Sequence, residues 1–473
     1  MFQRLILLCL LLCAPWAAAQ RLPELGDTSA AAISPGDERR LGENIMREIR
    51  RDPAYLDDPE VADYVDKLGN RLVAHSDSAR QKFEFFAVRD PQINAFALPG
   101  GFIGVHTGLI LAAQSESEIA GVLAHEVAHV TQRHIARMLD QQSQSQVLSI
   151  AALALAILAA RSDSQVGEAA MAFGQASVIQ SQLNFTRENE READRVGLQM
   201  LDGAGFDPRG MAGFFERLQR ATRLYEGGAP SYLRTHPLTF ERIGDIQNRI
   251  EQKPYRQVAD SLDFHLIRAK LRAESGTASD AVAFFENSLQ ERKFLSEAAS
   301  RYGLVASLIR ARDFGRARRE IPALVKTESP IIATLECRLA DAAGETDRAL
   351  DCYQRARRVH PGYRALFDGH VAQLVQSRRA TEALQLIDTR LRSEPNDPRL
   401  YRQQAKAHAA LGNRLQQHRA QGEAYVRTGE LGAAMEQMQF ALKTGEGDFY
   451  QLSAIEARLR ELRRLQAEQN RKR

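Results

Sequence analysis

The C-terminal half of the 473-residue chain carries an internal repeat of about 34 residues, and this period strongly constrains the fold. A small residue recurs once per period, and a large apolar residue follows each of them four positions later. The small residues are Ala281, Ala317, Ala349 and Ala383, spaced by 36, 32 and 34 positions, and the large ones are Phe285, Ile321, Tyr353 and Ile387. Small residues let helices pack closely, so the period predicts stacked helix pairs with a continuous core.

Proline positions support this reading, because Pro361 and Pro395 stand twelve residues after two of these alanines. The region resembles tetratricopeptide repeats, in which proline ends the second helix of each pair. Degraded copies continue toward the C-terminus, with Gly412, Gly429, Ala434, Met438 and Ala441 in comparable places. We expect an α-solenoid of about four to six helix pairs over residues 256–473. Such a solenoid binds protein segments on its concave face, and a purely structural helical domain is the alternative.

A second signal is chemical. Within residues 108–139, apolar residues recur at helical spacing and enclose a His-Glu-x-x-His motif at residues 125–129. Residues four apart share one helix face, so His125 and His129 can bind one metal ion. Glu126 projects about 100° away and can address an attacking water instead. The motif therefore predicts a zinc site with two histidine ligands and Glu126 as general base.

Catalytic zinc needs a third protein ligand and an open fourth position. Residues 189–194 read Asn-Glu-Arg-Glu-Ala-Asp, and in a helix Glu190 and Asp194 would share a face. We predict Glu190 as the third ligand. Asp194 is expected to accept a hydrogen bond from the ring N–H of His125 or His129 and so to orient that ligand.

The chain resembles the M48 family of zinc metallopeptidases, in the glutamate-ligand (gluzincin) group. Several short sequence blocks match that family in the same order along the chain. They are residues 94–101, Gly108-Leu109, the histidine motif, residues 190–194, and Thr235-His236-Pro237 with Arg242. The resemblance spans about residues 40–250. It implies an α+β gluzincin-type domain with a small β-sheet and one Zn²⁺ per chain, so that the whole protein is mainly α.

The same resemblance makes His236 a candidate catalytic residue. The matching histidine in the family can occupy the open zinc position and hold the enzyme latent, since neutral imidazole binds zinc well. Donation to the oxyanion in an open state is the competing role, and an ordinary turn before Pro237 is the third reading. Arg242 is expected, like Asp194, to contact the metal-binding side chains and keep them oriented without binding the metal itself.

A short β segment precedes the Pro99-Gly100-Gly101 turn signal. The resemblance implies that it is an edge strand beside the zinc and that it binds an extended substrate by backbone hydrogen bonds. The residues concerned are Asn94, Ala95, Phe96, Ala97 and Leu98. From the residues alone, an ordinary hairpin explains the segment equally well.

The N-terminus predicts export. Residues 1–19 contain Arg4, an apolar run and then Ala17-x-Ala19, the pattern of a signal peptide cleaved after Ala19. Residues 20–255 then form the expected peptidase domain. Cleavage leaves two cysteines, Cys337 and Cys352, which the repeat phase places on the two helices of one pair. An oxidising compartment would allow a disulfide between them.

Charge excludes one class of function. The chain has 63 Lys and Arg against 60 Asp and Glu, so it lacks the basic excess of a nucleic-acid binder. Residues 20–255 carry 25 basic and 32 acidic groups, a net of −7, whereas residues 256–473 carry 37 and 28, a net of +9. The two halves can attract each other, or the basic half can bind acidic partners or an anionic membrane surface. The apolar run at 147–160 is too short to span a bilayer, so we expect a buried or loosely held helix that covers the catalytic helix, and contact with a membrane or a membrane-protein client is the second hypothesis. Scattered solvated arginines are the alternative.

Together these features predict an exported, periplasmic zinc metalloendopeptidase with a helical repeat domain. The resemblance implies that it degrades or helps assemble outer-membrane β-barrel proteins, with unfolded or stalled proteins as clients and docking to the β-barrel assembly machinery through the repeats. The alternative is a chaperone or scaffold in which the repeats hold clients and the peptidase is latent.

Overall fold

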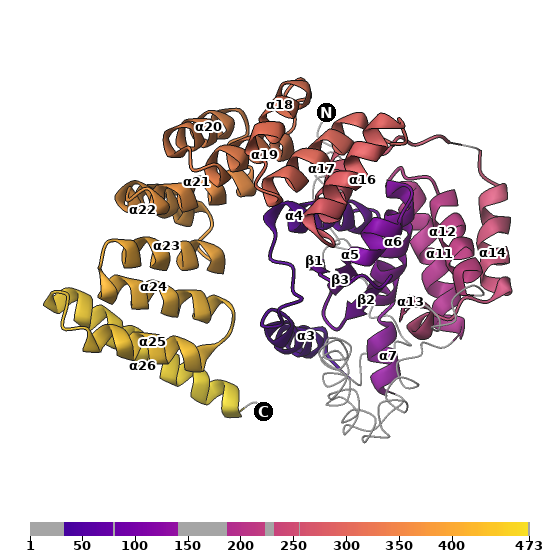
Figure 1. Ribbon diagram of the computed structural model, residues 1–473. Coiled ribbons are helices and arrows are strands. Elements are labelled where there is room, and N and C mark those ends of the chain that lie inside the picture. Colours follow the sequence, from indigo (N-terminus) through magenta and orange to yellow (C-terminus); the bar gives the residue numbers. More distant parts are fainter. Residues whose placement is uncertain (1–32, 79–80, 141–186, 223–230, 255, 472–473) are drawn as a thin grey trace, which may run out of the picture.

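The computed structural model describes residues 33–78, 81–140, 187–222, 231–254 and 256–471. Within these ranges the chain is mainly helical, with one three-stranded sheet, as predicted (Figure 1). No helix in these ranges combines the length and the apolarity that crossing a bilayer requires. The expected signal peptide at 1–19 and the apolar run at 147–160 lie outside the described residues.

The sheet has the order β1-β3-β2 and lies within residues 20–255, the expected peptidase domain, which we call the peptidase region. Strand β1 (Glu84–Val88) pairs parallel with β3 (Phe102–His106), and β2 (Ala95–Leu98) pairs antiparallel with β3. Gly100 and Gly101 turn the chain between β2 and β3 with φ of +77° and +88°, a conformation that favours glycine. Strand β2 is therefore an edge strand.

The other edge of the sheet is partly covered. The N–H of Leu56 donates to the carbonyl of Ala87 at 3.1 Å, and the N–H of Arg89 donates to the carbonyl of Ala54 at 2.7 Å. These bonds cover the end of β1, whereas no strand of the described residues pairs with the outer side of β2. Within the described part of the chain, β2 is therefore the edge strand whose outer side pairs with no other strand.

Helices cover both faces of the sheet. On one face α3 (Pro35–Ile49) buries Ile45, Met46 and Ile49 against the strands. On the other face lies α6 (Glu116–Thr131), which is buried along almost its whole length. Around α6 pack α4 (Pro59–Val73), α11 (Arg187–Gly203) and α12 (Arg209–Thr222), while α5 (Thr107–Ala112) follows β3. The remaining helices of this region are α7 (His134–Asp140), α13 (Ser231–Thr235) and α14 (Phe240–Glu251).

The C-terminal half forms six consecutive helix pairs within residues 256–471, which confirms the predicted repeat solenoid. The four period-marking alanines are all buried and lie on the second helices of their pairs. Cys337 and Cys352 lie on the two helices of one pair and are joined by a disulfide, with their Cα atoms 5.3 Å apart. The twelve helices are α15 (Leu262–Glu274), α16 (Ala278–Gln290), α17 (Glu297–Arg310), α18 (Phe314–Leu324), α19 (Pro330–Ala342), α20 (Thr346–Val359), α21 (Arg364–Gln376), α22 (Ala380–Ser393), α23 (Pro398–Ala410), α24 (Arg414–Arg427), α25 (Leu431–Lys443) and α26 (Phe449–Arg471).

The first repeat helices join the peptidase region through apolar packing. Helix α15 packs against α4 and α5 and buries Phe264 and Ile267 completely, in a core continuous with that of the peptidase region. Within this contact Lys270 Nζ lies 2.5 Å from Glu60 Oε2 and 2.6 Å from Asp58 Oδ2. We call this contact the apolar interface.

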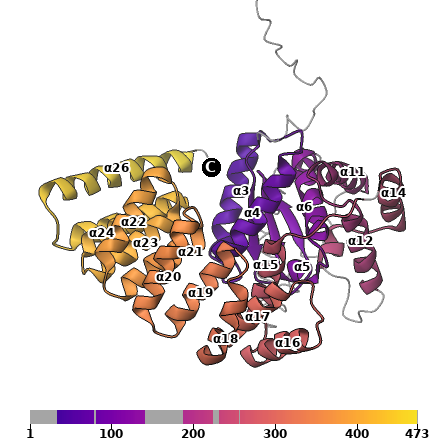
Figure 2. The same cartoon turned by 90° about the horizontal axis from the view of Figure 1, so that it is seen from above.

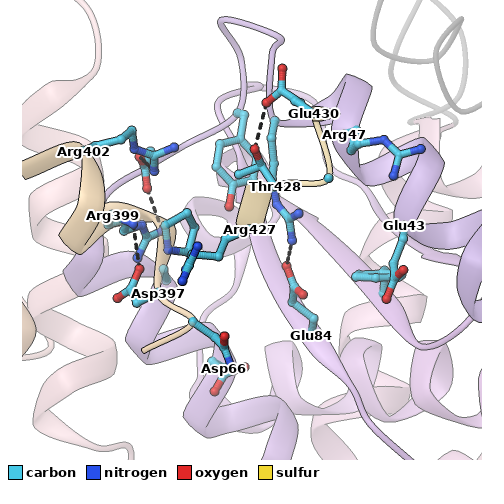
Figure 3. A pocket seen from close by; sticks show the side chains of 18 of the residues that line it. Glu43, Arg47, Asp66, Glu84, Asp397, Arg399, Arg402, Arg427, Thr428 and Glu430 are labelled. Atoms are coloured by element: carbon cyan, nitrogen blue, oxygen red, sulfur yellow. Dashed lines mark hydrogen bonds and ion pairs between the residues drawn. The ribbon is translucent and has the colours of Figure 1, made fainter. Parts of the chain in front are cut away.

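Farther along, the repeats curve so that their C-terminal end faces α3 (Figures 1 and 2). Here ion pairs make the contact. Arg399 and Arg402 on α23 lie 2.6 and 3.6 Å from Asp57, and Glu430, before α25, lies 2.7 Å from Arg51. These pairs border a cleft of about 830 Å³, and most of the side chains labelled in Figure 3 are charged. Among the described residues, the apolar clusters of these later repeats include no peptidase side chain, so we call this contact the polar interface.

Candidate metal centre

Close packing of two helices builds the site. Gly197 on α11 faces α6, where an added Cβ would lie 3.0 Å from the backbone of Ala124 and His125. The missing side chain lets α11 approach α6 closely. As a result, the face of α11 that carries Glu190 and Asp194 lies directly against the histidines of α6.

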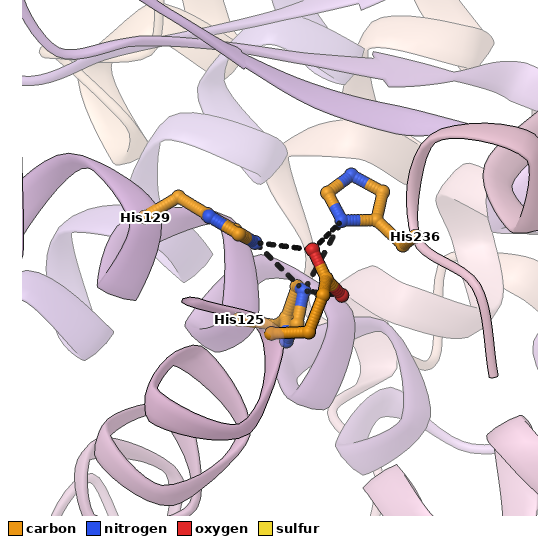
Figure 4. Close-up of side chains that lie close together, drawn as sticks. His125, His129 and His236 are labelled. Atoms are coloured by element: carbon orange, nitrogen blue, oxygen red, sulfur yellow. Dashed lines mark hydrogen bonds and ion pairs between the residues drawn. The ribbon is translucent and has the colours of Figure 1, made fainter. Parts of the chain in front are cut away.

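Four side chains converge at this contact: His125, His129, Glu190 and His236 (Figure 4). All are buried, and their donor atoms lie within 4.8 Å of one another. His129 Nε2 is 3.0 Å from His125 Nε2, and the Glu190 oxygens are 3.3 and 3.4 Å from these two nitrogens. His236 Nδ1 is 3.0 Å from Glu190 Oε1 and 3.4 Å from His125 Nε2.

These spacings fit a tetrahedral metal ion. Ligands about 2.0–2.1 Å from a zinc ion at the centre of a tetrahedron lie about 3.3 Å from one another. Three imidazoles and one carboxylate are also ligand types that zinc prefers. The geometry can therefore hold a metal ion, with His236 Nδ1 at the fourth corner.

Behind the ligands, Asp194 and Arg242 form a buried support. Asp194 Oδ1 lies 3.0 Å from His125 Nδ1, the nitrogen that faces away from the cluster. The Arg242 guanidinium donates to both Asp194 oxygens at 2.7 and 2.8 Å, and its Nη1 lies 2.7 Å from Glu190. The same nitrogen donates to the carbonyl of Pro237 at 2.8 Å, so one guanidinium connects α11 to the segment that carries His236.

The electrostatics favour an ionised ligand carboxylate. Burial raises the pKa of Glu190, but the charge of His236 and hydrogen bonds from His125 and His129 outweigh it and hold that pKa well below its ordinary value. Burial lowers the pKa of His125, yet its carboxylate partners Asp194 and Glu190 outweigh this and raise it to about 9.

Glu126 lies beside the cluster, not within it. Its carboxylate is buried, and Oε1 is 3.6 Å from His236 Nε2. Burial raises the pKa of Glu126 above its ordinary value, while His236, His125 and the backbone of Ala97 oppose the rise. Because Ala97 belongs to the free edge of β2, the candidate general base and the candidate substrate strand are neighbours.

The other expected substrate-binding residues occupy β2 and the position before it. Asn94 is buried, and its carbonyl accepts the N–H of His106 at 3.0 Å. Ala95 and Leu98 are buried as well, whereas Phe96 and Ala97 are half-buried. The strand is thus anchored at both ends, and its middle is the more accessible part.

Two buried side chains next to the cluster had not been expected from the sequence. The Tyr232 ring stacks on His236, with ring centroids 4.8 Å apart and an interplanar angle of 26°. The N–H of Tyr232 and the hydroxyl of Ser231 both donate to the carbonyl of Ile93, just before β2. His134 lies behind His129, with 2.9 Å between their Nδ1 atoms. Tyr232 gave no signal in the sequence, whereas His134 could have been noticed as a third histidine close to the motif.

Comparison with known proteins agrees with this geometry. Residues 59–250 match the family model for peptidase family M48. The β-barrel assembly-enhancing protease of Escherichia coli K12 is 31% identical over 456 residues, which cover 95% of this chain and 92% of that protein. A Vibrio cholerae relative, provisionally given the same name, is 36% identical over 427 residues and 88% of each chain. The mitochondrial metalloendopeptidase OMA1 of Schizosaccharomyces pombe is 31% identical over 231 residues, 47% of this chain and 64% of its own.

Proposed function

The chain belongs to peptidase family M48 and is a metallopeptidase, and from this premise we propose that it is an exported, zinc-dependent endopeptidase that degrades or helps assemble outer-membrane β-barrel proteins. The observation that carries the proposal is the cluster of four ligand atoms within 4.8 Å. It lies in a chain that matches the assembly-enhancing proteases over both the peptidase and the repeat regions. We propose the domain boundary near residue 255, between α14 and α15.

In this proposal His125, His129 and Glu190 are the zinc ligands, and bound zinc would polarise the scissile carbonyl. Glu126 takes the proton of the attacking water and passes it to the leaving amine, a role that suits a buried carboxylate with a raised pKa. The free edge of β2 holds the substrate in extended form beside Glu126. Asp194 and Arg242 keep His125 and Glu190 oriented.

Replacing the general base tests this assignment. Glu126→Gln should reduce cleavage of an unfolded β-barrel protein by at least about a hundredfold, because general-base catalysis commonly contributes that much. Metal content, measured by atomic absorption, should stay at one zinc per chain because Glu126 is not a ligand. Undiminished cleavage, or a metal-free wild-type protein, would reject the proposal.

We further propose that His236 holds the enzyme latent as a fourth ligand. Its Nδ1 is as close to Glu190 as the two motif histidine nitrogens are to each other, 3.0 Å in both cases. His236→Ala should then raise peptidase activity by freeing the fourth position, and the double variant with Glu126→Gln should lose the gain. A loss of activity with full zinc content would instead assign His236 to the oxyanion.

Export and the compartment belong to the same proposal. The disulfide between Cys337 and Cys352 suits an oxidising compartment such as the periplasm. Binding of client proteins or of the β-barrel assembly machinery by the repeats would follow from the concave surface of a solenoid.

The latent arrangement also supports a second candidate function, a chaperone or scaffold whose repeats hold clients. Helix α15 packs into the peptidase core, so removing the repeats would expose a large apolar surface. The full-length Glu126→Gln variant is therefore the better probe. If it restores client assembly as well as the wild type does, holding rather than cutting is the main activity.

A further inference from the structure

A chain of polar side chains runs behind His129, on the side away from the ligand cluster. His129 Nδ1 lies 2.9 Å from His134 Nδ1, and His134 Nε2 lies 3.0 Å from Glu192 Oε2. Arg137 Nη2 donates to the same Glu192 oxygen at 2.7 Å. His129 and His134 are fully buried, whereas the side chains of Glu192 and Arg137 are 27% and 39% exposed.

The direction of each hydrogen bond follows from metal binding. If His129 binds the metal through Nε2, its ring proton must sit on Nδ1. That proton needs an acceptor, and His134 Nδ1 can accept it only when the proton of His134 sits on Nε2. Glu192 is placed to accept this second N–H. One tautomer of each ring therefore satisfies every hydrogen bond in the series from His129 through His134 to Glu192.

A local break in the helix creates this contact. On an uninterrupted helix His134 would lie about 140° around the axis from His129, too far to reach its ring. Instead α6 ends at Thr131, and Arg133 adopts φ of +53°, a left-handed conformation that side chains other than glycine rarely take. Helix α7 then begins at His134 and returns its imidazole to His129. This turn, and not the helical repeat, therefore brings His134 within reach of His129.

The two histidine ligands thus have matching supports. His125 is held by Asp194 and its guanidinium partner, and His129 is held by His134 and Glu192. Both supporting carboxylates stand on α11, two and four residues after Glu190. One helix therefore supplies a metal ligand and the supports for the other two ligands.

We propose that His134 and Glu192 are positioning residues that fix the tautomer and the orientation of His129 for metal binding. This inference rests on the proposed zinc site and extends it to two residues that do not touch the metal. Groups of this kind typically contribute 10–100-fold to metal affinity.

The test measures zinc affinity by competition with a chromophoric chelator, together with the visible spectrum of the Co²⁺-substituted protein. His134→Leu should weaken zinc binding about 10–100-fold and alter the Co²⁺ spectrum. His134→Gln, whose amide can both accept and donate, should recover most of the affinity. Glu192→Leu should weaken binding in the same direction.

His106→Leu is the matched control, because His106 is equally buried and is not one of the clustered ligands. It should lower thermal stability without changing zinc affinity or the Co²⁺ spectrum. Wild-type affinity in His134→Leu, or equal losses in His134→Leu and His106→Leu, would overturn the inference while leaving the zinc site intact. Failure of the wild type to bind zinc would instead reject the proposed function itself.

Discussion

The apolar and polar interfaces both contain short ion pairs, yet they place those pairs in different surroundings. Lys270 lies 2.5 Å from Glu60 in the apolar interface, and the two side chains are 4% and 2% exposed. Arg399 lies 2.6 Å from Asp57 in the polar interface, where the side chains are 22% and 48% exposed. Because the distances are nearly equal, burial decides what each pair contributes.

This difference indicates two mechanical roles. The apolar interface merges the first repeats with the peptidase into one core, which ion pairs can only reinforce. The polar interface closes the far end of the solenoid over α3 without shared apolar packing among the described residues. We therefore expect the first contact to be permanent and the second to depend on ionic strength.

The largest effect is expected from Lys270→Met. It leaves the carboxylates of Glu60 and Asp58 without their ammonium in a buried site, which typically costs about 3–5 kcal/mol. The midpoint of unfolding in urea should fall accordingly. The peptidase and repeat regions should then unfold in two separate transitions instead of one. Limited proteolysis and circular dichroism followed along the same urea titration would show this.

A double variant separates lost charge from lost packing. Adding Glu60→Gln to Lys270→Met removes the buried negative charge and should recover part of the stability. The equivalent truncation in the polar interface, Arg399→Met, should cost less than about 1 kcal/mol. Equal costs for Lys270→Met and Arg399→Met would remove the distinction between the interfaces.

The next largest effect concerns the cleft. Asp57→Lys places a cation opposite Arg399 and Arg402 and should open the polar interface, since each exposed pair contributes about 0.2–1 kcal/mol. Small-angle X-ray scattering at low salt should show a larger radius of gyration than for the wild type. In about 1 M salt, where the Debye length is about 3 Å, the two proteins should become alike.

The same charge change outside both interfaces is the control. Glu291 is exposed on the repeat surface, so Glu291→Lys should leave the scattering curve unchanged. A wild-type radius that does not respond to salt would show that the polar interface is not held by charge.

The sequence predicted what depends on local spacing. The placement of His125 and His129 on one helix face needed only helical periodicity, and the repeat period predicted the solenoid. The choice of Glu190 rested instead on the need of catalytic zinc for a third protein ligand. His236 came from family resemblance, because its approach depends on a turn far along the chain. His134 could not be placed, since its position depends on one left-handed residue that no propensity predicts.

Overall charge predicted the interfaces only partly. Arg399 and Asp57 follow the expected attraction between a basic and an acidic half, but Glu430 and Arg51 pair in the opposite sense. Net charge averages over such pairs, so it cannot indicate which residues meet. The apolar interface was not foreseen, because buried faces of α4 and α15 look like any other helix core in the sequence.

A smaller effect is expected at Asp368 on α21. Whereas Glu60 pairs with Lys270, the Asp368 carboxylate accepts a hydrogen bond from the side-chain amide of Gln403 at 2.7 Å. Burial raises its pKa to about 6, against the opposing effects of Gln403 and Arg364. The folded protein therefore holds this proton more tightly than the unfolded chain, and stability falls as pH rises from about 4 to about 6.

Asp368→Asn removes the titration and keeps an oxygen for Gln403. The variant should be more stable than the wild type at pH 7, by on the order of 1 kcal/mol, and equally stable below about pH 4. Urea midpoints from circular dichroism at the two pH values give the comparison. A constant difference between the proteins at both pH values would show that titration of Asp368 is not responsible.

The smallest effect tests whether the turns, and not the packing, distinguish the two ends of the solenoid. After the first helix of each of the first five pairs, the chain takes a left-handed residue, alternately glycine and arginine. These residues are Gly276, Arg312, Gly344, Arg378 and Gly412, with φ between +60° and +75°. Relief of left-handed strain at an arginine is worth about 1–2 kcal/mol, and the extra freedom of glycine in the unfolded chain offsets about 0.5–1 kcal/mol of it.

Arg312→Gly, in the second helix pair, and Arg378→Gly, in the fourth, should therefore each raise the free energy of unfolding by a similar small amount, up to about 1 kcal/mol. The reverse change, Gly344→Arg, should cost a similar amount, because an added Cβ there meets no atom within 4 Å and only the backbone conformation opposes it. Thermal unfolding of the three variants gives the comparison. If Arg312→Gly and Arg378→Gly differ from each other by more than their individual gains, local turn strain contributes to the contrast between the interfaces. If they agree, that contrast arises from burial alone, since the turns at both ends then carry the same strain.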